Sequence, residues 1–95
     1  MTLTDQYLNL VNHQLPHAAK QRPYPVRANH CFARIILDNL FQDVWYRHLE
    51  KPAYKNMTAE QLRMAIALGQ QYLRDPQSCF TANQNSLRLR QKLRH

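Results

Sequence analysis

Side chains that recognise anions gather in the stretch from Lys20 to Tyr54. Those that could together hold a phosphate, a carboxylate or an acidic side chain are Arg22, Tyr24, Arg27, His30 and Arg34. His30 follows Asn29, a residue type favoured at helix N-caps, so we expect it in the first turn of a helix. Backbone N–H groups and the helix dipole favour negative charge there. The pattern predicts a site for an anion or a partner protein at the amino end of the second helix.

The same residues also allow a structural interpretation. His30, Arg34, Asp38 and Gln42 recur every fourth residue and form one polar stripe on the expected helix. In this interpretation Arg34 pairs with Asp38, which is worth roughly a few tenths of a kcal/mol, and His30 is solvated. Both interpretations stay open at the level of the sequence.

Groups for nucleophilic, acid–base or metal chemistry are sparse. Cys31 could meet His48 with a carboxylate behind it, but Cys31 lies on the apolar side of its helix, where burial makes a thiol inert. His13 and His17 are separated by Pro16, which should break the helix that would bring them together. We therefore expect no catalytic residue, no metal and no other cofactor, and the sequence favours a binding protein over an enzyme.

Positive charge is concentrated in two blocks. The 95 residues carry a formal net charge of +7, and residues 20–34 and 86–95 each contain four basic residues and no acid. The basic residues of the second block are Arg88, Arg90, Lys92 and Arg94. Such blocks attract polyanions, so the first hypothesis is a nucleic-acid or polyanion binder.

The alternative hypothesis is an adaptor, a regulatory domain or a domain for small anionic ligands. It would use the surface from Arg22 to Asp38, and its partner would be an acidic protein surface or an anionic metabolite. A pocket at the start of the second helix would favour this alternative, whereas two basic blocks on one continuous face would favour nucleic acid. The oligomeric state does not follow from the sequence.

The chain has a single glycine, Gly69, which excludes some ligand-binding loops and predicts a contact between helices. Gly69 lies in a strongly helical stretch, so phosphate-binding loops that need several glycines are excluded. A glycine inside a helix costs about 1 kcal/mol relative to alanine, and close approach of another helix is the usual compensation. Because Gly69 shares a face with Leu62, Ile66 and Leu73, we expect a helix contact there.

The expected fold is a single compact all-α domain of four to five helices over residues 1–95. The first helix should run from about Asp5 to Gln14 and end at Pro16, and residues 16–28 should form a proline-rich extended strap. The second should begin with Asn29 as its N-cap. The third should begin with Thr58 as its N-cap, in a capping box with Gln61. The fourth should start at Pro76, capped by Asp75, and fray into a basic tail at residues 86–95.

Two cysteines, and an amino terminus without a basic flank and an apolar run, predict a cytoplasmic protein. No apolar run approaches the roughly 20 residues of a membrane-spanning helix, so no membrane partner is expected.

Residues Asn29-His30-Cys31-Phe32-Ala33-Arg34, followed by Asp38-Asn39 and Trp45-Tyr46, resemble a group of short bacterial proteins. Some of these proteins carry an acetyltransferase-like label, and the resemblance covers residues 29–54. An acetyl-coenzyme A enzyme of the common fold needs a glycine-rich pyrophosphate loop and a central sheet. This chain has neither feature, so the resemblance transfers no functional residue.

Overall fold

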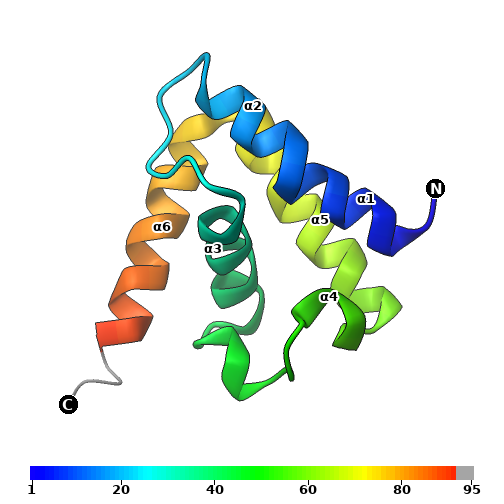
Figure 1. Ribbon diagram of the computed structural model, residues 1–95. Coiled ribbons are helices and arrows are strands. Elements are labelled where there is room, and N and C mark those ends of the chain that lie inside the picture. Colours follow the sequence, from blue (N-terminus) through cyan, green and yellow to red (C-terminus); the bar gives the residue numbers. More distant parts are fainter. Residues whose placement is uncertain (92–95) are drawn as a thin grey trace.

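Helices make up most of residues 1–91, the part of the chain that the computed structural model describes (Figure 1). In chain order the elements are α1 (Leu3–Asn9), the π-helical segment η1 (Leu10–Gln14), α2 (Leu15–Ala19), α3 (Asn29–Phe41), the 3₁₀ turn η2 (Trp45–Arg47), α4 (Ala53–Asn56), α5 (Ala59–Arg74) and α6 (Pro76–Gln91). Because α1, η1 and α2 follow one another without a break, the described residues form five helical rods. The prediction of an all-α domain of four to five helices is confirmed.

Pro16 does not end the first helix, which is a difference from the prediction. The rod starts after Thr2, whose hydroxyl accepts a hydrogen bond from the Asp5 N–H at 3.0 Å, and it continues to Ala19. In a regular α-helix the proline ring would collide with the carbonyl four residues earlier. The wider turns of η1 directly before Pro16 make room for the ring, and Pro16 lies at the start of α2, where its missing N–H costs little.

The extended strap is consequently shorter than predicted. Residues 16–19 belong to α2, and the non-helical segment comprises residues 20–28. It crosses from the end of α2 to the start of α3 (Figure 1). Two of its side chains hold it against the end of α5, because both Arg22 and the Tyr24 hydroxyl donate to backbone carbonyls there.

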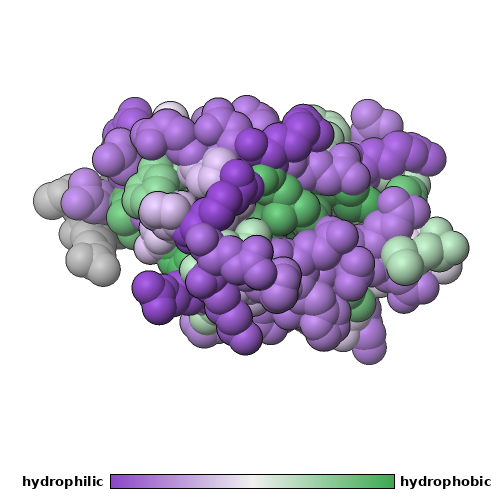
Figure 2. All heavy atoms as spheres, turned by 90° about the horizontal axis from the view of Figure 1, so that it is seen from above, coloured by the Kyte–Doolittle hydropathy of each residue, from purple (hydrophilic) through white to green (hydrophobic). Residues whose placement is uncertain are grey.

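Helix α3 lies at the centre of the domain and contacts η1, η2, α5 and α6. Its buried residues are Phe32, Ile35, Ile36, Leu37 and Asp38. The apolar side chains among them join the core that α1, η1, α5 and α6 close around. Most of the face seen in Figure 2 is hydrophilic, with hydrophobic atoms visible in a band between polar rows. None of the helices within residues 1–91 is long and apolar enough to span a membrane.

The predicted starts of α5 and α6 are confirmed, whereas the predicted fraying from residue 86 is not seen as far as Gln91. Thr58 caps α5 by accepting from the Gln61 N–H at 3.1 Å, and the Gln61 side chain accepts from the Thr58 N–H at 2.9 Å. Asp75 accepts from the Gln77 N–H at 3.1 Å at the start of α6, with Pro76 in the first helical position. Helix α6 continues to Gln91, so the predicted tail is helical at least that far, and the remainder of it lies outside the described residues.

Candidate ligand-binding site

Arg34 and Asp38 do not form the intrahelical pair of the structural interpretation. The Arg34 guanidinium donates to the Ser86 hydroxyl and to the Asn83 side-chain oxygen, both at 2.8 Å. Asp38 is fully buried and accepts from the Ser86 hydroxyl at 2.6 Å and from Arg90 Nε at 2.8 Å. Both α3 residues therefore point to α6, and this buried polar cluster joins the two helices.

The residues predicted to converge on the start of the second helix are also dispersed. Arg22 and Tyr24 bond to the carbonyls of Leu73 and Tyr72 at the end of α5, so they do not close over His30. Arg27 and His30 are exposed. Since Arg34 is engaged with α6, the predicted five-residue anion site is not assembled.

Three backbone N–H groups at the start of α3, those of residues 30–32, are used within the chain. Ala28, not Asn29, occupies the N-cap position. The His30 N–H donates to the side-chain oxygen of Asn29 at 2.9 Å, and the N–H groups of Cys31 and Phe32 donate to the Ala28 carbonyl at 3.1 and 3.2 Å. An anion at this helix end would have to replace these bonds.

The second basic block is partly internal. Arg90 is bound to Asp38, and its guanidinium carbon lies 5.6 Å from the ring centre of Tyr46. Arg88 is exposed and lines a groove between α5 and α6. Lys92 and Arg94 lie outside the described residues. The role of Arg88 and of these two residues in binding nucleic acid stays a prediction.

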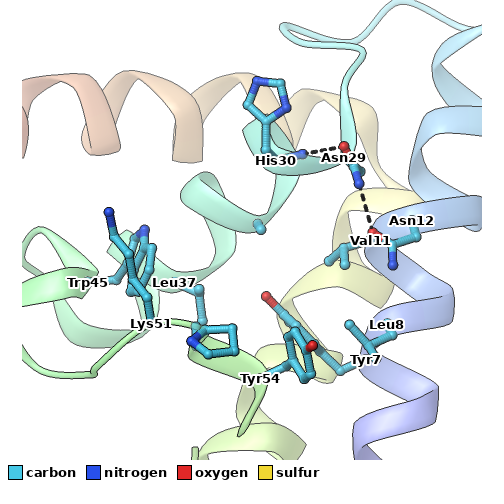
Figure 3. Close-up of a pocket in the computed structure, with 13 residues that line it drawn as sticks. Tyr7, Leu8, Val11, Asn12, Asn29, His30, Leu37, Trp45, Lys51 and Tyr54 are labelled. Atoms are coloured by element: carbon cyan, nitrogen blue, oxygen red, sulfur yellow. Dashed lines mark hydrogen bonds between the residues drawn. The ribbon is translucent and has the colours of Figure 1, made fainter. Parts of the chain in front are cut away.

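A cavity of about 390 Å³ opens beside the start of α3. It lies between the first helical rod, α3 and the segment from η2 to α4 (Figure 3). Apolar atoms make most of its wall, and these come mainly from Leu8, Val11, Ala33, Leu37, Trp45, Pro52 and Ala53. The polar lining residues are Tyr7, Asn12, Asn29, His30, Lys51 and Tyr54. We call this cavity the α3 pocket.

Tyr7 supplies a polar group to the α3 pocket. The residue as a whole is only 3% exposed, and Figure 3 shows its hydroxyl directed into the space between the first rod and Trp45. No hydrogen bond joins the hydroxyl of Tyr7 or Tyr54 to another lining residue. Burial raises the pKa of Tyr7 far above its ordinary value of 10.0, so its hydroxyl stays protonated and can donate.

The rim of the pocket carries further donors and no acid. Asn29 donates to the side-chain oxygen of Asn12 at 3.0 Å, which leaves the Asn12 amide nitrogen free to donate elsewhere. The Lys51 side chain runs beside Trp45 at one edge, and the His30 ring points away from the cavity (Figure 3). With no Asp or Glu among the lining residues, the electrostatics favour a ligand that is anionic or rich in acceptors.

Only His30 of the predicted site residues lines the α3 pocket. The pocket residues that were not predicted include Lys51 and the aromatic residues Tyr7, Trp45 and Tyr54. The three aromatic residues were missed because such side chains are usually core residues. One signal was present: a buried tyrosine hydroxyl normally needs a hydrogen-bond partner, and Tyr7 lies within an apolar stripe.

Apart from His30, no His, Cys, Asp or Glu of the described residues lines the α3 pocket. Within residues 1–91 no three His, Cys, Asp or Glu side chains are placed to hold a metal ion. Burial raises the pKa of the Cys79 thiol to about 12. His48 bonds to Asp43 at 3.1 Å and stacks on the Phe41 ring, at 4.9 Å between ring centres.

No protein-family model, curated protein or solved structure matches this chain. Its function must therefore be inferred from the geometry of the α3 pocket.

Proposed function

We propose that this protein is a binding domain whose α3 pocket takes up a small anionic ligand with an apolar body. The observation that carries the proposal is a cavity with mostly apolar walls into which the Tyr7 hydroxyl points without a hydrogen-bond partner among the lining residues. Small-molecule sites are typically apolar cavities of about 300–1,000 Å³ with a few directed polar groups, and the α3 pocket has this character.

Charge supports an anionic ligand over a neutral one. The net charge of +7 attracts anions to the molecule as a whole, and the lining residues include a lysine but no acid. The free thiols of Cys31 and Cys79 support the expectation of a reducing, cytoplasmic setting.

Nucleic-acid binding through the two basic blocks is the competing proposal. Internal hydrogen bonds engage Arg22 and Arg34 of the first block and Arg90 of the second, so fewer charges are available for phosphates than the sequence suggests. The pocket at the start of α3 is the feature that favours the ligand-binding alternative.

The test is a titration with naphthalene-2-sulfonate, which combines a flat apolar body with one negative charge. Trp45 is the only tryptophan and lines the pocket, so its fluorescence reports binding, and the methyl NMR signals of Leu8, Val11 and Leu37 locate it. We expect saturable changes at all four residues. Absence of saturation at roughly millimolar ligand would refute the proposal.

A pocket-filling variant supplies the control. Ala33→Phe places a ring in the cavity and should abolish binding, whereas Ala67→Phe, at an exposed position of α5 that does not line this pocket, should leave it unchanged. A short single-stranded oligonucleotide is titrated in parallel. If it shifts the signals of Arg27 and Arg88 while the pocket signals stay fixed, nucleic-acid binding is the better proposal.

A further inference from the structure

The hydrogen-bonding groups of the α3 pocket also indicate which anion it accepts. From their number and type, and given the proposed function, we infer that the ligand is a hydrophobic monocarboxylic acid and not a phosphate ester. Its carboxylate would accept from the Tyr7 hydroxyl, and its apolar body would lie against Leu8, Val11, Leu37 and Trp45.

The supply of donors is too small for a phosphate. A phosphate group at neutral pH carries close to two negative charges and three acceptor oxygens, and proteins hold it with several cations or with a row of backbone N–H groups. The lining residues contain one lysine, at the edge of the pocket (Figure 3). At the start of α3, the N–H groups of residues 30–32 already bond to Asn29 and Ala28.

A carboxylate matches what is present. It carries one negative charge and two acceptor oxygens, which suits two phenol hydroxyls, the amide nitrogen of Asn12 and the distant charge of Lys51. Burial keeps Tyr7 neutral, so it donates to the carboxylate and does not repel it. A hydrogen bond from a neutral donor to an ionised acceptor is about twice as strong as one between neutral groups.

The apolar wall requires the second half of the ligand. Leu8, Val11 and Leu37 are aliphatic and Trp45 is aromatic, so an acid without an apolar body would leave this surface in contact with water. The Tyr7 hydroxyl has no hydrogen bond to another lining residue, so it can donate to the incoming carboxylate. Polar and apolar contacts thus favour the same amphipathic ligand.

Three probes of nearly equal shape test the inference: phenylacetate, phenylacetamide and phenyl phosphate. Trp45 fluorescence gives each Kd, and the Leu8 and Val11 methyl signals confirm the place of binding. We expect phenylacetate to bind about tenfold more tightly than the other two probes, the ratio expected when one charge-assisted hydrogen bond is lost. If phenyl phosphate binds equally well or better, the inference is wrong although the proposed function stands. If naphthalene-2-sulfonate and all three probes fail to bind, the proposed function itself is wrong.

Two conservative variants separate the Tyr7 hydroxyl from the shape of the pocket. Tyr7→Phe removes the hydroxyl alone and should weaken phenylacetate binding about tenfold while phenylacetamide binding changes little. Tyr72→Phe is the control, because it removes a tyrosine hydroxyl that is buried without a hydrogen-bond partner and does not line the α3 pocket. Equal affinities of the parent protein and the Tyr7→Phe variant for phenylacetate would overturn the inference.

Discussion

Gly69 shows how a single residue determines a helix contact. A Cβ atom at this position would lie 2.2 Å from Leu10 Cδ2 and 3.3 Å from Ile36 Cδ1. Leu10 belongs to η1 and Ile36 to α3, so the glycine lets α5 approach two neighbouring helices at once. The sequence could predict this contact, because a lone glycine inside a strong helix usually marks a place where another element packs closely.

Enlarging this residue should destabilise the fold. Gly69→Leu is expected to lower the free energy of unfolding by about 1–3 kcal/mol through overpacking, although leucine has the better helix propensity. Urea unfolding measures the change. Ala67→Leu, at an exposed position of the same helix, should change stability far less. An increase in Tm for Gly69→Leu would contradict the contact.

At the scale of elements, the α3–α6 contact depends on a buried polar cluster. The four-residue spacing correctly placed Arg34 and Asp38 on one face of α3. Their partners Ser86 and Arg90 lie about 50 residues further along the chain, and no local pattern could indicate them. Asp38 also accepts from the Trp45 N–H at 3.1 Å, so it anchors η2 to α3 as well.

Removing the central carboxylate of this cluster should be costly. Asp38→Ala leaves the Arg90 guanidinium without its partner and is expected to lower the free energy of unfolding by about 3–5 kcal/mol. Glu60→Ala is the control, because Glu60 forms an exposed pair with Arg63 worth at most about 1 kcal/mol. Thermal or urea unfolding compares the two variants. Equal effects would mean that the cluster does not hold α6 in place.

At the scale of the whole molecule, the sequence predicted the all-α fold class but not the α3 pocket. The scarcity of glycine, the capping box of Thr58 and the cap at Asp75 are local signals, and they predicted the helical class and several boundaries. The predicted end of the first helix at Pro16 was wrong, because a proline interrupts a regular α-helix but fits after the wider turns of η1. The α3 pocket is built from residues between Tyr7 and Tyr54 on separate elements, so only the packed chain brings them together.

Buried tyrosines should also make the whole fold sensitive to high pH. Burial raises the pKa of Tyr7 and Tyr72 far above 10.0, so both hydroxyls stay neutral in the folded chain and ionise more readily in the unfolded one. Their contribution to stability is therefore complete below about pH 10, the ordinary tyrosine pKa, and is lost as the pH rises above it. Tyrosinate absorbance should show both ionising together with loss of helical circular dichroism.

A variant with both Tyr7→Phe and Tyr72→Phe isolates this effect. Its free energy of unfolding should fall less steeply above pH 10 than that of the parent protein. Identical slopes would show that other groups cause the alkaline loss of stability.

The π-helical segment η1 determines how α1 and α2, the two halves of the first rod, are rotated relative to each other. Each residue of an α-helix advances the chain by about 100° around the axis, since 3.6 residues make one turn. The π-helical segment Leu10–Gln14 holds more residues per turn, so it sets the rotational phase of α1 relative to α2. Deleting one residue there would restore regular turns and swing Tyr7 and Leu8 away from the α3 pocket, while α2 could keep its buried Leu15. The shape of the α3 pocket thus depends on the π-helical segment η1, although η1 supplies few of the lining residues.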